Sequence, residues 1–148
     1  MKKYLRYIVA FCLCLCFCTV ATYASAPVAT SSTEIVYLED GNYVEIVTTV
    51  FSNSRSTITD ASKEYIYKTY FDRKLFSYTL WGRFEYNGTT SKATDVAYTH
   101  TIYDSEWNLG SHRESYSGNT VYGSATFGGP YIETIGGSIS CDKNGNIS

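Results

Sequence analysis

Beyond its first 26 residues the chain has a single cysteine, Cys141, so an exported form would fold without an internal disulfide. Leucine, methionine and alanine are scarce in the same part, which argues against a helical domain because these residues favour helices. The two prolines, Pro27 and Pro130, lie outside every strand-like run. Without a repeat, coiled-coil period or low-complexity tract, one globular domain stabilised by packing is expected.

Motifs that would identify an enzyme are missing as well. The chain has neither the Gly-x-Ser-x-Gly turn of serine hydrolases nor the His-Glu-x-x-His helix of zinc proteases. His100 and His112 are the only histidines, and a catalytic pair of either with Cys141 is supported by no motif. We therefore expect a protein that is not an enzyme and uses no cofactor, and a small hydrolase is the least favoured alternative.

Residues 1–26 have the pattern of a signal peptide. Basic residues begin the chain, an apolar run extends from Ile8 to Ala21, and Ala24-Ser25-Ala26 fits the small-x-small cleavage rule. Pro27 disfavours cleavage after Ala26, so cleavage after Ala24 is a competing possibility. The prediction is a secreted, extracellular protein, and the alternative is a membrane anchor formed by the uncleaved segment. The cysteines of the apolar run are interpreted as small hydrophobic residues rather than as a lipid-attachment site.

Negative charge prevails once this leader is removed. Three of the twelve basic residues leave with it, whereas all fourteen acidic residues stay. The remaining chain therefore has nine basic and fourteen acidic residues, a net charge of −5. This balance argues against nucleic acid or an anionic membrane as the main partner. The oligomeric state is left open.

The remaining residues are rich in threonine, serine, tyrosine and glycine, which favour strands and turns. Asp40-Gly41 and Asn87-Gly88 are typical of tight hairpins. Residues 27–33 are predicted to be a flexible leader and residues 52–63 a polar loop. Alternating patterns predict strands over 34–38, 43–51, 64–71, 75–86, 93–103, 111–116, 120–127 and 131–141. We expect residues 34–148 to form one all-β domain, a single antiparallel β-sandwich of seven or eight strands, with a small β-barrel as the alternative.

The two tryptophans are the candidate ligand contacts. Trp81 lies on the polar side of its strand, where it offers a stacking surface, is returned to the core by a bulge at Gly82, or is covered by another element. Trp107 lies in the turn 104–110, where it either anchors a ligand with Glu106 and Asn108 or folds back to cap the domain. The sharper hypothesis is that a ligand, an extracellular glycan or protein, meets this turn with Trp107 as its anchor.

Two features near the C-terminus allow a structural interpretation. Asp142 to Asn146 resembles a calcium loop but has its glycine one place early and lacks the closing glutamate, so a tight turn is favoured and no metal site is predicted. Cys141 shares a face with Ile135 and Ile139, which predicts a buried, inert thiol. Gly136-Gly137 suggests a bulge.

Four segments carry a resemblance to a known group of proteins. They are Tyr78-Thr79-Leu80-Trp81-Gly82-Arg83-Phe84-Glu85-Tyr86-Asn87-Gly88, Tyr103-Asp104-Ser105-Glu106-Trp107, Ser117-Gly118-Asn119-Thr120 and Ser140-Cys141-Asp142-Lys143-Asn144-Gly145-Asn146. Over residues 65–148 the chain resembles small exported proteins of Gram-positive anaerobic bacteria. The resemblance implies an exported β-domain and brings no activity or site residue with it. Besides a binding module, a structural or cell-surface-associated protein without a discrete ligand site therefore stays open.

Overall fold

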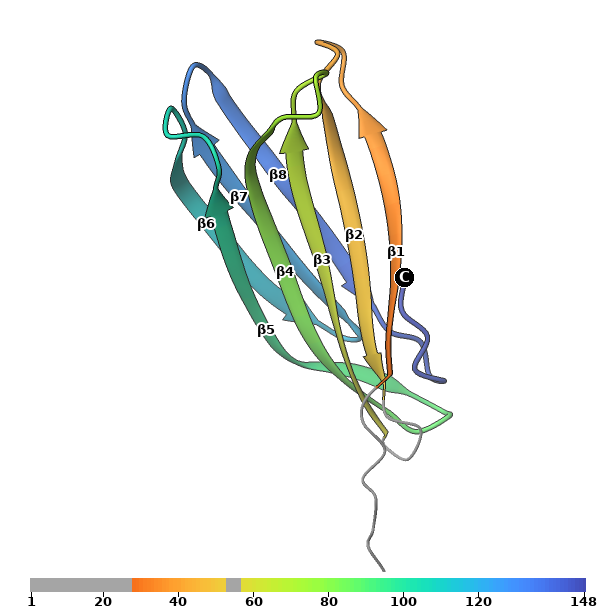
Figure 1. The fold of residues 1–148 in the computed structure, drawn as a ribbon. Coiled ribbons are helices and arrows are strands. Elements are labelled where there is room, and N and C mark those ends of the chain that lie inside the picture. Colours follow the sequence, from red (N-terminus) through yellow and green to blue (C-terminus); the bar gives the residue numbers. More distant parts are fainter. Residues whose placement is uncertain (1–27, 53–56) are drawn as a thin grey trace, which may run out of the picture.

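The computed structural model describes residues 28–52 and 57–148, and this part of the chain is built from eight β-strands (Figure 1). The predicted signal peptide and its two cleavage positions lie outside these residues. The strands are β1 (Val28–Tyr37), β2 (Tyr43–Ser52), β3 (Ile58–Lys68), β4 (Lys74–Tyr86), β5 (Ser91–Ile102), β6 (Asn108–Ser117), β7 (Thr120–Gly128) and β8 (Ile132–Ser140). Among the described residues there is no helix that could span a membrane.

The strands form two antiparallel sheets that pack face to face. The larger sheet has the order β1-β2-β3-β4-β5 and the smaller one the order β6-β7-β8, so the chain passes from one sheet to the other after β5 (Figure 1). Strands β7 and β8 lie against β3, β4 and β5. The prediction of an all-β sandwich is confirmed, with separate sheets rather than one closed sheet.

Strand β4 shows why the sequence forms this core. Its even-numbered apolar residues, Phe76, Tyr78, Leu80 and Phe84, are fully buried between the sheets. Because side chains alternate along a strand, the odd-numbered residues face away from the smaller sheet. We call that side of β1–β5 the outer face of the five-stranded sheet.

Tyrosines of the larger sheet are accommodated by glycines of the smaller one. A β-carbon added at Gly123 would lie 2.2 Å from the hydroxyl oxygen of Tyr78, and one added at Gly137 would lie 2.6 Å from that of Tyr65. Each glycine therefore leaves the space that a tyrosine ring occupies. The Tyr78 hydroxyl donates a 2.8 Å hydrogen bond to Glu114, which meets the polar requirement of its buried end.

Two segments predicted to lack regular structure are strands. Val28–Thr33, expected to be a flexible leader, belong to β1 and pair with β2 from Val47 to Ser52. Residues 58–63, expected to be part of a loop, begin β3 and pair with both neighbours. Both predictions are wrong for the same reason: ladder hydrogen bonds join backbone groups, so a polar segment rich in threonine and serine forms a strand where neighbouring strands supply the partners.

Near the C-terminus, the predictions for Cys141 and for the turn that begins at Asp142 are confirmed. Cys141 is fully buried, as predicted, and burial raises the pKa of its thiol to about 11. Asp142 accepts hydrogen bonds from the backbone amides of Asn144 and Asn146, which makes the predicted tight turn. The expected bulge at Gly136-Gly137 is wrong, because β7 and β8 pair without interruption.

Candidate ligand-binding site

The turn that carries Trp107 is organised by Asp104. The Asp104 carboxylate accepts hydrogen bonds from the Glu106 amide (3.1 Å) and from the Arg73 guanidinium (2.6 Å), and its backbone carbonyl accepts one from the Trp107 amide (3.0 Å). These bonds close the chain into a turn directly before β6. The indole that follows is directed into the end of the sandwich.

Trp107 is a core residue, with only 5% of its surface exposed. Its ring centroid lies 4.7 Å from that of Phe76 and 4.9 Å from that of Tyr131, the latter in an edge-to-face arrangement. The expectation of an exposed Trp107 anchor is therefore wrong, and its alternative, a cap on the end of the sandwich, is what the structure shows. Glu106 and Asn108 are exposed beside it, but no free indole face lies between them.

Trp81 has the opposite environment. It is partly exposed on the outer face of the five-stranded sheet, in regular register with Ser62 on β3 and Ala97 on β5. The register shift that a bulge produces comes two residues later, between Arg83 and Phe84. The interpretation in which a bulge at Gly82 returns Trp81 to the core is therefore wrong.

Small cross-strand neighbours leave a shallow depression beside this tryptophan. Since Ser62 and Ala97 are short, the indole has no bulky side chain on either flank. The depression has a volume of about 400 Å³ and an almost wholly apolar surface. The residues that line it are Phe51, Ser62, Thr79, Trp81, Ala97, Tyr98 and Thr99.

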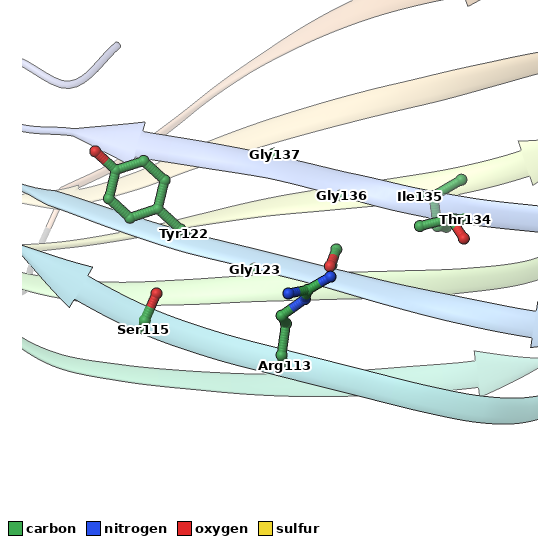
Figure 2. A pocket seen from close by; sticks show the side chains of 9 residues that line it. Arg113, Ser115, Tyr122, Gly123, Thr134, Ile135, Gly136 and Gly137 are labelled. Carbon is green, nitrogen blue, oxygen red and sulfur yellow. The ribbon is translucent and has the colours of Figure 1, made fainter.

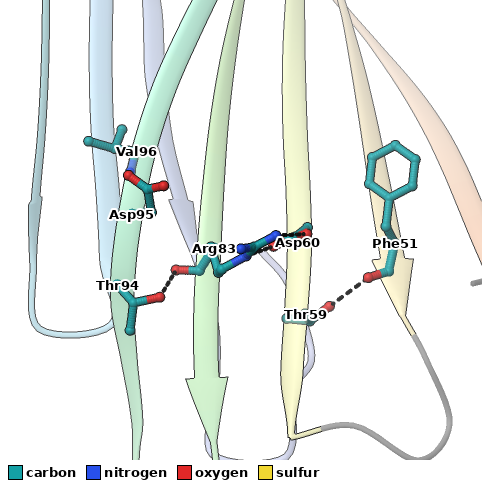
Figure 3. Close-up of polar contacts among 7 residues, drawn as sticks. All are labelled: Phe51, Thr59, Asp60, Arg83, Thr94, Asp95 and Val96. Carbon is teal, nitrogen blue, oxygen red and sulfur yellow. Dashed lines mark hydrogen bonds and ion pairs between the residues drawn. The ribbon is translucent and has the colours of Figure 1, made fainter.

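Arg83 of β4 and Asp60 of β3 form an ion pair (Figure 3). Arg83 donates from Nε and Nη2 to the two carboxylate oxygens of Asp60, at 2.8 and 2.9 Å. Its guanidinium carbon also lies 5.4 Å from the centroid of the Trp81 ring, a cation–π distance. A two-point contact with a carboxylate is geometrically specific, so Arg83 holds the indole in place.

Of the residues around this depression, only Trp81 was predicted from the sequence, and Arg83 and the other neighbours were missed. Phe51, Asp60, Ser62 and Ala97 come from three other strands, and only the pairing of β2, β3, β4 and β5 places them around the indole. Ser62 and Asp60 fell in the segment expected to be a loop. The one signal in the sequence was Phe51, a large apolar residue directly before the polar segment 52–63, and the structure shows it exposed at the end of β2.

A second polar cluster connects the two sheets at their β5–β6 side. His112 Nε2 lies 2.7 Å from the Tyr98 hydroxyl, and His112 Nδ1 lies 3.0 Å from a Glu114 carboxylate oxygen. The other oxygen of Glu114 accepts the bond from Tyr78. A carboxylate that orients an imidazole can serve proton transfer, but here both ring nitrogens are engaged by the side chains that join the sheets.

The structure does not bring the remaining candidates together. Cys141 pairs with Ile147 and its carbonyl accepts bonds from Ser91 and Asn119, whereas His112 pairs with Ala125 in the middle of the sheet. His100 is exposed opposite Tyr78. Within residues 28–52 and 57–148, no group of three or more metal-ligating side chains is close enough to hold an ion.

Comparison of the chain with protein-family models, with curated proteins and with solved structures finds no match in any of the three.

Proposed function

We propose that the protein is a secreted, non-catalytic binding domain that holds a glycan outside the cell through Trp81 on the outer face of the five-stranded sheet. The observation that carries this proposal is the apolar depression beside a partly exposed indole with small residues on both flanks. Sugar rings present an apolar C–H face that stacks on tryptophan, and such a flat surface needs little depth.

Polar groups around the depression support a sugar over an apolar ligand. Thr79, Thr99 and Ser62 belong to the lining but expose almost no polar surface there, so the polar groups at hand are those of the Arg83–Asp60 ion pair beside Trp81. A saccharide requires both a stacking surface and surrounding donors and acceptors. A protein ligand is the alternative within the same hypothesis, with Trp81 as the central contact.

Export and the absence of catalysis belong to the same proposal. They are supported by the signal-peptide pattern, by the lack of a catalytic motif and by the engagement of both His112 nitrogens. The acidic balance supports a partner other than nucleic acid or an anionic membrane.

Replacement of Trp81 tests the proposal directly. The purified protein is assayed by affinity electrophoresis in gels that contain soluble cell-wall and plant polysaccharides. We expect at least one polysaccharide to retard it, and Trp81→Ala to weaken the binding about tenfold or more because the stacking surface is lost.

Tyr116→Ala is the matched control, because it removes an exposed aromatic residue from the other sheet. It should bind like the unmodified protein, and both variants should melt within about 4 °C of it, as surface changes do. Retardation by none of the polysaccharides, or equal retardation of the Trp81 variant, would contradict the proposal.

A second candidate function is favoured by β1. All ten residues of this edge strand are exposed, and among the described residues its outer side has no partner strand. A free edge of this length can pair with another copy, as a structural or surface-associated protein would require. Sedimentation that is independent of concentration would argue against this candidate.

A further inference from the structure

The side of β6–β8 that faces away from the core, which we call the outer face of the three-stranded sheet, is rich in hydroxyl groups. Three rows of paired residues cross its centre. They are Ser115–Tyr122–Ser138, Arg113–Ser124–Gly136 and Ser111–Thr126–Thr134. Arg113 is the only charged residue in them, and no aspartate or glutamate is present there.

A depression of about 400 Å³ lies over the middle row (Figure 2). Gly136 belongs to its lining and contributes no side chain: its φ of +149° is one that other residues rarely adopt, and an added β-carbon would lie 2.3 Å from the Gly123 carbonyl oxygen. In Figure 2 the Arg113 side chain extends from β6 over β7, while Tyr122 and Thr134 stand at the border.

Arg113 has no counter-ion within the described residues. Of the arginines described, Arg73 pairs with Asp104 and Arg83 with Asp60, whereas the Arg113 guanidinium forms no ion pair or hydrogen bond with the described residues. Its neighbour Glu114 points to the other side of the sheet, where Tyr78 and His112 hold both carboxylate oxygens. In a domain with an excess of acidic residues, an exposed unpaired guanidinium at a depression is available to an external anion.

The hydroxyl groups at the same place are also available. The Ser115 and Ser124 hydroxyls have no hydrogen-bond partner among the described residues, and the Thr134 hydroxyl bonds only to that of Thr126, at 2.9 Å. The Tyr122 side chain is about half exposed at the edge of the depression. One cation, several hydroxyls and an aromatic ring together provide the contacts that a carboxylate-bearing sugar needs.

We propose that this depression is a second binding site, for an acidic sugar whose carboxylate is held by Arg113 and whose ring lies against Tyr122. Ser124 and Thr134 would bond to the sugar hydroxyls. The site lies on the opposite side of the sandwich from Trp81, so it goes beyond the proposed function and does not depend on it.

Titration of the ¹⁵N-labelled protein by nuclear magnetic resonance tests this site. The probes are glucuronate, galacturonate and N-acetylneuraminate. The comparison ligands are the uncharged methyl ester of glucuronic acid, and acetate. We expect the acidic sugars to shift the amides of Ser124 and Gly136 and the Arg113 Nε–H. The methyl ester of glucuronic acid lacks the charge and acetate lacks the ring, so each should bind at least about tenfold more weakly than glucuronate.

Variants separate this site from the one at Trp81. Arg113→Gln should weaken glucuronate binding about tenfold or more, and Arg113→Lys should recover part of it because one charge returns without the planar fork. Trp81→Ala should leave this titration unchanged. The proposal would be overturned if none of the three acids shifted these signals, or if the methyl ester or acetate bound as tightly as glucuronate. It would also be overturned if Arg113→Gln had no effect on glucuronate binding.

Discussion

At the scale of single residues, the two tryptophans have opposite environments. Trp107 is enclosed by Phe76, Tyr67 and Tyr131, and a β-carbon added at Gly129 would come within 2.7 Å of its ring. Trp81 is partly exposed and has short neighbours. The same residue type therefore stabilises the fold at one position and offers a contact surface at the other.

Replacement of Trp107 by alanine should destabilise the protein severely. Loss of a buried ring removes its packing and leaves a cavity, which costs about 3–5 kcal/mol. For a domain of this size that corresponds to a fall in Tm of roughly 10–20 °C. Thermal denaturation followed by circular dichroism measures it, with Trp81→Ala as the comparison. A fall of similar size in both variants would contradict the assignment of Trp107 to the core and Trp81 to the surface.

At the scale of elements, β1 is an edge strand whose ten residues are all exposed. It pairs only with β2, and none of its residues is buried, whereas β3 and β4 each pair on both sides and supply most of the large core residues. Its stability therefore comes from one ladder of hydrogen bonds. Local opening of such a strand exposes little new apolar surface.

Hydrogen exchange should reveal this difference. We expect the β1 amides bonded to β2 to exchange about tenfold or more faster than the bonded amides of β3 and β4, because β1 can open without disturbing the core. Exchange measured residue by residue at neutral pH tests it. Equal protection in β1 and β4 would mean instead that another chain covers the β1 edge. If the protection of β1 then increased with protein concentration, that chain would be a second copy of this protein.

At the scale of the whole molecule, the core depends on neutral tyrosines. Burial raises the pKa of Tyr65 to about 12, and burial also raises the pKa values of Tyr67 and Tyr78 above the ordinary 10.0. Above pH 10 the unfolded chain releases these protons while the folded one retains them. Stability is therefore complete below about pH 10 and falls as the pH rises towards 12, by at most about 1.4 kcal/mol per pH unit for each tyrosine.

Alkaline unfolding should accordingly be cooperative. Tyrosinate absorbance from the core should appear together with the loss of the β-sheet circular dichroism signal. Tyr65→Phe removes one of the protons but keeps the ring, so it should move the midpoint to higher pH. Ionisation of the core tyrosines while the sheet signal persists, or an unchanged midpoint in Tyr65→Phe, would contradict this explanation.

Patterns in the sequence were enough to predict the all-β class, most strand positions, the tight turns and the burial of Cys141. These follow from alternation along one strand and from the conformations that Asp-Gly and Asn-Gly accept, and both are local properties. Local signals were insufficient where a segment is polar: β1 and the start of β3 exist because a neighbouring backbone supplies hydrogen-bond partners.

Which residues form the candidate sites depends on contacts between strands that are distant in the sequence. Whether a tryptophan is exposed depends on what packs against it, and Phe76 and Tyr131 reach Trp107 from distant parts of the chain. The depression beside Trp81 depends on register between strands, and the one beside Arg113 on a glycine opposite Ser124. Tyrosine–glycine contacts such as Tyr78 with Gly123 join the two sheets, so no pattern within a single strand could reveal them.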